Sequence, residues 1–199
     1  MSIVTLNNRA LKDATAVGTT TGLGDLVFIS RSTASSSSSV NITSGIDSTY
    51  KEYIFMFNNI HGSAASDFQI NFSIDGGSNY NVTKTTTAVS AYHSESDGTP
   101  DVYYIASHDL AQSTSAKKIM GTIYNDNDNS GSGYLHLFDP SNTTFVKHFI
   151  SSTQRTDNAT SNNFYTAGYG NTTSAINAVQ FTMASGTIDS GTIDMYGVK

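Results

Sequence analysis

The chain is divided into short apolar runs that are separated by Gly, Asn, Asp and Ser. In the most regular run, Phe68, Ile70, Phe72 and Ile74 alternate with polar residues. This period of two places apolar side chains on one face of a strand, whereas an amphipathic helix repeats about every 3.6 residues. Short alternating runs with turn residues between them favour antiparallel strands.

We expect about ten strands, and therefore an all-β, antiparallel β-sandwich that is jelly-roll-like. The candidate strand segments are residues 26–29, 40–42, 50–60, 68–74, 80–87, 102–106, 118–124, 134–138, 144–151, 163–169, 176–183 and 192–196. Between them, residues 108–116 have a spacing that predicts at most one helical turn.

Two segments give sharper predictions. Within residues 50–60, both the odd and the even positions from Ile54 to Phe57 are apolar. This predicts a central strand that is covered on both faces. The glycines of 75–80, Asp-Gly-Gly-Ser-Asn-Tyr, supply the positive φ that a tight turn needs. We therefore expect a hairpin that joins the strand at 68–74 to a strand at 80–87.

Charged residues make up only 13% of the chain, about half of the usual share, and polar uncharged residues replace them. Strands cover their solvent face with Thr, Ser and Asn, so this composition also favours sheet. The net charge is −6 with ten Lys and Arg in total, so nucleic acid is not an expected partner. The chain has no cysteine, which excludes disulfides and thiolate chemistry.

We divide the chain into an N-terminal arm, residues 1–24, and a β-sandwich domain, residues 25–199. The arm is a docking segment or a loose terminus. The first residues lack the basic and apolar regions of a signal peptide, and no run approaches the roughly 20 apolar residues that span a bilayer. We therefore expect no membrane partner, and if the protein works outside a cell, something other than its own leader takes it there, such as release by host lysis. The apolar residues that would dock are Ile3, Val4, Leu6 and Leu11.

Tyrosines near the loop of residues 93–101 suggest a glycan site. Aromatic rings stack on the apolar faces of sugars, and carboxylates accept hydrogen bonds from their hydroxyls. The alternative is that these rings fill the core or a subunit interface. The candidate glycan-binding residues are Tyr92, Tyr103, Tyr104, Asp97 and Asp101.

The loop of Asp126, Asp128 and Ser130 begins like a calcium-binding loop, because hard oxygen ligands follow one another at alternate positions. Counting on from Asp126, the twelfth position is Leu137 and not the Glu that completes an EF-hand. The alternative is a polar hairpin loop. We expect no metal and no other cofactor. No Gly-x-Ser-x-Gly motif accompanies the five histidines, and no catalytic residue is predicted.

The C-terminal stretches 176–183 and 186–198 resemble a closing pattern of tailed-phage structural proteins, in which a glycine turn precedes a final strand. Met195 and Val198 stand where that pattern has Leu and Ile. Residues 72–80 are similar to a strand and turn of the same group, and residues 1–9 to N-terminal segments of marine phage appendage proteins.

The resemblance implies a virion protein that contacts other virion proteins, such as a tail-fibre, appendage or capsid-decorating subunit, which is commonly a homotrimer. It implies no catalytic residue. We therefore expect a non-enzymatic structural protein of the virion that docks by its arm. The alternatives are an adhesin module that binds host surface glycans in host attachment, and a glycan depolymerase, whose carboxylate pair the sequence does not reveal.

Overall fold

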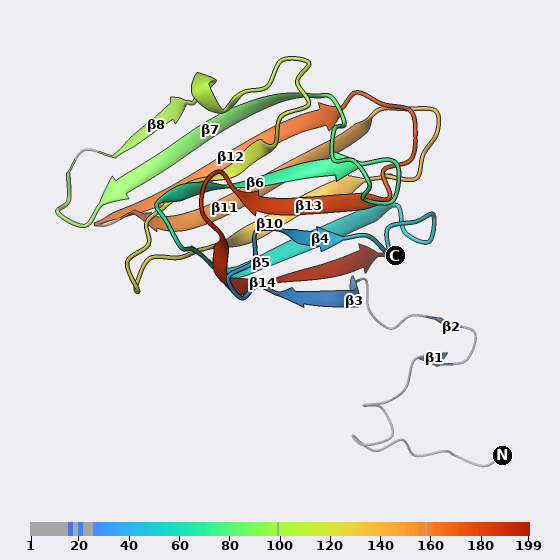
Figure 1. Ribbon diagram of the computed structural model, residues 1–199, viewed down its shortest axis with the longest axis horizontal. Helices are drawn as coiled ribbons and strands as arrows, with labels where there is room; N and C mark the ends of the chain where they lie inside the picture. Colours follow the sequence, from blue (N-terminus) through green and yellow to red (C-terminus); the bar gives the residue numbers. More distant parts are fainter. Residues whose placement is uncertain (1–15, 18–19, 22–25, 99, 158) are drawn as a thin grey trace, which may run out of the picture.

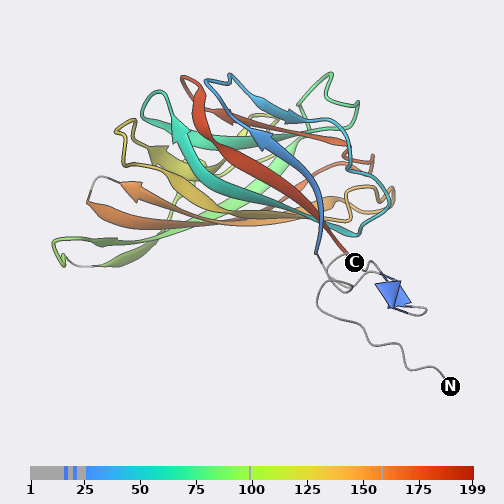
Figure 2. The same ribbon diagram turned by 90° about the horizontal axis from the view of Figure 1, so that it is seen from below.

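The computed structural model describes residues 16–17, 20–21, 26–98, 100–157 and 159–199. The expected arm residues Ile3, Val4, Leu6 and Leu11 lie outside the described residues. In the described part, an eight-stranded and a four-stranded sheet form the two layers of a β-sandwich (Figures 1 and 2). All strand pairs are antiparallel, so the expected all-β fold class is confirmed.

The two sheets contain twelve strands, and each candidate segment of the sequence overlaps one of them. In spatial order, the large sheet consists of β3 (Leu26–Thr33), β14 (Ile188–Val198), β5 (Glu52–Gly62), β10 (Gly131–Phe138), β11 (Lys147–Asp157), β12 (Thr160–Gly170), β7 (Lys84–Ser94) and β8 (Asp101–Tyr104). The small sheet consists of β4 (Val40–Ile42), β13 (Ala178–Met183), β6 (Ser66–Ser73) and β9 (Lys117–Ile123). Apart from them, β1 (Ala16–Val17) pairs with β2 (Thr20–Thr21), and one 3₁₀ turn, η1, spans Ala106–His108.

The core lies between the two sheets and is rich in phenylalanine. Phe57 of the large sheet contacts Phe68 and Phe181 of the small sheet, with ring centroids 5.3 Å apart in both pairs. Phe68 and Phe181 stack on neighbouring strands. The alternation of β6 therefore has the expected cause, since Phe68, Ile70 and Phe72 are fully buried against the large sheet.

We call the face of the large sheet that points away from the small sheet the outer face. On β5, Tyr53, Phe55 and Phe57 point into the core, so Ile54 and Met56 point to the outer face. In the described part of the chain, no second layer covers this face (Figure 2). Ile54 is nevertheless only 8% exposed, because it lies between Tyr196 and His136 of the adjacent strands. β5 is thus apolar at both odd and even positions, as noted in the sequence. The prediction that it is covered on both faces is wrong within the described residues, because only the small sheet packs on it.

The predicted hairpin at 75–80 is wrong. Gly76 and Gly77 do adopt positive φ, of 72° and 90°. However, β6 belongs to the small sheet and β7, which begins at Lys84, belongs to the large one. The turn therefore carries the chain from one layer to the other, and residues 80–83 are not in a strand.

Three lysines are fully buried beside the apolar core: Lys84, Lys117 and Lys147. Lys84 Nζ donates to Asn71 Oδ1 at 2.6 Å and to the carbonyl oxygen of Val82 at 2.7 Å. Lys117 Nζ donates to the carbonyl oxygen of His108 at 2.5 Å. Burial lowers the pKa of both Lys84 and Lys117 to about 8, because a charged ammonium loses its hydration there.

Candidate ligand-binding site

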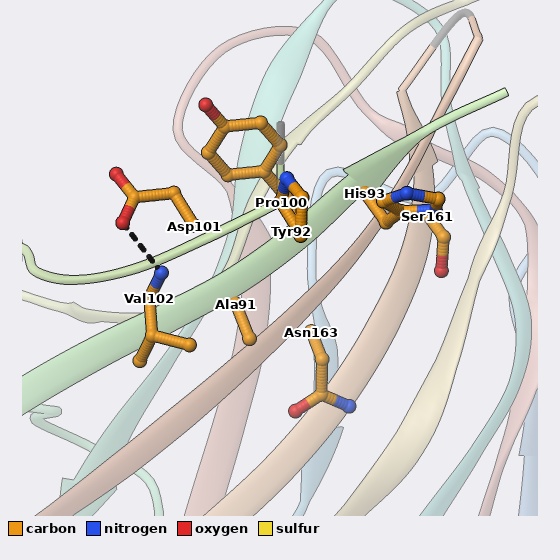
Figure 3. A pocket seen from close by; sticks show the side chains of 8 residues that line it. All are labelled: Ala91, Tyr92, His93, Pro100, Asp101, Val102, Ser161 and Asn163. Carbon is orange, nitrogen blue, oxygen red and sulfur yellow. Dashed lines mark hydrogen bonds between the residues drawn. The ribbon is translucent and has the colours of Figure 1, made fainter. Parts of the chain in front are cut away.

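A hollow of about 630 Å³ lies at the end of the outer face where β7, β8 and β12 are neighbours (Figure 3). This volume falls within the range of small-molecule sites, about 300–1,000 Å³. Three of the lining side chains are aliphatic and the rest are aromatic or polar. The lining residues are Ala91, Tyr92, His93, Pro100, Asp101, Val102, Ser161 and Asn163.

The strand register builds this hollow. Ala91 of β7 pairs with Val102 of β8 on one side and with Asn163 of β12 on the other. Side chains of directly paired residues point to the same face of a sheet, so these three form one row on the outer face. Between β7 and β8 the chain reverses in a turn, in which the amide of Asp97 donates to the carbonyl oxygen of Ser94 at 3.1 Å.

Polar groups around the hollow keep hydrogen-bonding capacity. Asp101 Oδ1 accepts the amide hydrogen of Val102, at 2.8 Å, at the edge of the hollow. Asn163 Oδ1 has no hydrogen-bond partner within the described part of the chain and is shielded from solvent. A buried amide oxygen without a partner is costly, so a ligand that reorients this carboxamide and bonds it would recover that cost.

The structure brings together some of the predicted glycan residues and separates others. Tyr92 and Asp101 both border the hollow, but they alternate with Ala91 and Val102, so their side chains point to the opposite face of the sheet (Figure 3). Asp97 stands beside it in the turn, 3.4 Å from His93 Nε2. Tyr103 packs edge-on against Tyr92, and the Tyr104 hydroxyl donates to Asp109, so neither ring lines the hollow.

Three polar lining residues were not among the predicted site residues: His93, Ser161 and Asn163. Ser161 and Asn163 belong to β12, which lies next to β7 only through a long-range pairing. The sequence did hold one indication of this. Ser161, Asn163 and Tyr165 are alternate residues, and residues two apart in a strand point to the same face of the sheet.

The candidate calcium residues lie in the turn between β9 and β10. Asp126 and Asp128 are exposed there, and the amide of Asn129 donates to the carbonyl oxygen of Asp126 at 2.9 Å. Across the ranges that the structure describes, no group of three or more His, Asp or Glu side chains is placed to hold a metal ion. The calcium hypothesis for Asp126, Asp128 and Ser130 thus stays a prediction.

Histidine contacts elsewhere are with carboxylates, a carbonyl oxygen or rings. His136 contacts Glu52 on the outer face, and His61 lies 3.4 Å from Asp189. His108 stacks on Phe164 with ring centroids 5.6 Å apart, and burial lowers the pKa of His108. These histidines therefore contact neighbouring side chains through ring packing or through carboxylates.

Comparison with known proteins finds no matching family model, no matching curated protein and no matching solved structure. Within the described residues, no helix has the length and apolar character to cross a membrane.

Proposed function

We propose that this chain is a non-enzymatic binding protein that holds a glycan in the hollow between β7, β8 and β12. The observation that carries this proposal is the composition of the hollow. A carboxamide, a hydroxyl and an imidazole accompany aliphatic surface on the uncovered outer face of the sheet. These polar groups are Asn163, Ser161 and His93, whereas Tyr92 and Asp101 stand at the edge with their side chains on the opposite face.

This combination matches the chemistry of a sugar. A pyranose presents hydroxyls at its rim, which bond to carboxylates and amides, and C–H groups on its faces, which pack on aromatic rings and aliphatic side chains. Asn163, Ser161 and His93 would bond the hydroxyls, while Ala91 and Val102 would contact the ring. No phosphate or nucleic acid is proposed, because none of the described residues that line the hollow is Lys or Arg.

The test is a glycan array probed with the full chain, followed by calorimetric titration of the strongest ligand. Asn163→Ala and Ser161→Ala should each weaken binding by about 10-fold or more, because each removes hydrogen bonds to hydroxyls. The matched control is Asn58→Ala, since Asn58 is an exposed carboxamide on β5, outside the hollow. An array without any bound glycan, or equal binding by all three variants, would contradict the proposal.

We further propose that the protein acts in a tailed-phage virion, as a tail-fibre, appendage or capsid-decorating subunit. Its sequence resemblance to phage structural proteins supports this setting, and docking by Ile3, Val4, Leu6 and Leu11 follows from their apolar character in a short arm. Deleting residues 1–15 should leave a folded, soluble sandwich that no longer joins particles. Retained incorporation of the deletion variant would refute the docking role.

A further inference from the structure

The outer face carries an apolar patch that is distinct from the hollow. We call it the outer patch; it consists of Phe28, Ile54, Met56, Tyr134, Ile150 and Tyr196, from the adjacent strands β3, β14, β5, β10 and β11. Phe28 pairs with Tyr196, which pairs with Ile54, and the rings of Phe28 and Tyr196 are 5.6 Å apart. Met56 pairs with Tyr134 in the next row. The patch is therefore continuous across the strands.

Much of this patch is in contact with water in the single chain. Phe28 is 53% exposed and Ile150 is 44% exposed. Single exposed apolar residues are common on protein surfaces, but a contiguous apolar patch marks an interaction site. The sequence of β5, apolar on both parities, is that of a strand with cover on both faces. The small sheet supplies one cover, and the outer patch lacks the other.

The centre of the outer face is also hollowed. A depression of about 380 Å³ is lined by Tyr134, Ile150, Tyr165 and Val89 among others. Apolar depressions of this kind receive the anchoring side chains of protein partners, whose burial contributes most of the binding energy.

The charges of this region favour a second copy of the same chain. The whole chain has a net charge of −6, but the ionic groups that border the outer patch are paired. Asp194 accepts both hydrogen bonds of a bidentate pair with Arg31 at 2.7 Å, and Glu52 contacts His136. Two copies would therefore meet there with the charge of Asp194 neutralised by Arg31 in each copy and with Glu52 in contact with His136. A strongly charged partner would find no complementary charge on the patch.

The area is also sufficient. Five strands spaced about 4.8 Å apart, with the two rows of the outer patch and the adjoining outward row of Leu26, Val198 and Phe138 about 7 Å apart, present roughly 500 Å² per copy. Two copies would bury about 1,000 Å² in total, which is the lower limit for a specific interface. We propose that two copies pack outer patch against outer patch and form a two-fold dimer. The hollow lies at the other end of the sheet, over β7, β8 and β12, so this dimer does not depend on glycan binding.

An interface that uses the same patch on both subunits closes as a dimer, not as the trimer that the phage resemblance implies. Light scattering of the full chain across a concentration series therefore tests the proposal. We expect a mass that approaches twice the 21.2 kDa of one chain as concentration rises. A stable trimer, or a monomer up to about millimolar concentration, at which even weak specific complexes form, would overturn it.

A matched pair of variants tests which surface is used. Ile150→Arg introduces a charge on the outer patch twice per dimer and should raise the dissociation constant about 100-fold or more. Ile74→Arg is the control, because Ile74 has nearly the same exposure, 41% against 44%, but follows β6 of the small sheet. Thermal unfolding should show both variants folded. Equal dimerisation of the two variants would refute the assignment, and so would loss of the dimer when residues 1–15 alone are deleted.

Discussion

Raising the pH should stabilise the protein, because Lys84 and Lys117 are buried with a pKa lowered from 10.5 to about 8. Between these two values the unfolded chain binds a proton that the folded chain has released, so the free energy of unfolding increases with pH. From about pH 7 to about pH 9.5, each lysine contributes about 2 kcal/mol, or about 4 kcal/mol for both. Below pH 8 both lysines are charged in either state, and their contribution no longer changes with pH.

Urea unfolding at the two pH values measures this difference. The upper limit is set below pH 10, since burial raises the pKa of Tyr53 and Tyr80 and their ionisation in the unfolded chain then favours unfolding. The double variant Lys84→Met with Lys117→Met should lose most of the pH-dependent gain, and each single variant about half. A free energy of unfolding that is flat or falls between about pH 7 and 9.5, or a gain that survives in the double variant, would refute the reasoning.

Three further predictions concern the core, a strained glycine and acid unfolding. Phe181→Ala should cost about 3–5 kcal/mol of stability in urea unfolding because Phe181 is fully buried, whereas Phe145→Ala, at an exposed site, should change stability by less than about 0.5 kcal/mol. Gly133→Ala should cost more than about 3 kcal/mol, since Gly133 has φ of 152° and a Cβ would lie 2.4 Å from a backbone carbonyl oxygen. Gly76→Ala, with φ of 72° and nothing within 4 Å, should cost about 1 kcal/mol; equal unfolding midpoints for these two variants would contradict the steric argument. Burial lowers the pKa of His108, so the urea midpoint should fall as pH decreases through 6.5, and less so in His108→Gln.

Local pattern was enough to locate the strands. The period of two in β6 and the apolar runs of β5 and β13 predict strands because backbone geometry alternates side chains between faces. The glycine turn at 75–80 shows where such reasoning stops. Positive φ at Gly76 and Gly77 specifies that the chain reverses, but the next strand can pair with its neighbour or enter another sheet. That choice depends on the packing of the whole core.

Only part of the candidate site could be predicted from the sequence, for the same reason. Tyr92 and Asp101 lie on two strands joined by a short turn, so their proximity follows from local sequence. Asn163 reaches the hollow through the register of β12 with β7, which the sequence of either strand alone does not fix. Tyr104 was assigned to the site by its type and proximity in sequence, but its hydroxyl is bonded to Asp109 and its ring lies outside the hollow.

The position of the last strand has a consequence for biosynthesis. β14 follows the other strands of both sheets in sequence, yet it lies between β3 and β5 in the large sheet. During synthesis, β3 and β5 therefore lack their shared partner until β14 has left the ribosome. Until then β3 has no partner in the large sheet and β5 can pair only with β10, so a nascent chain exposes unpaired strand edges, which promotes aggregation. Expression of truncated chains that lack β14 should accordingly yield insoluble protein, whereas a tag placed after Lys199 leaves β14 free to complete the sheet.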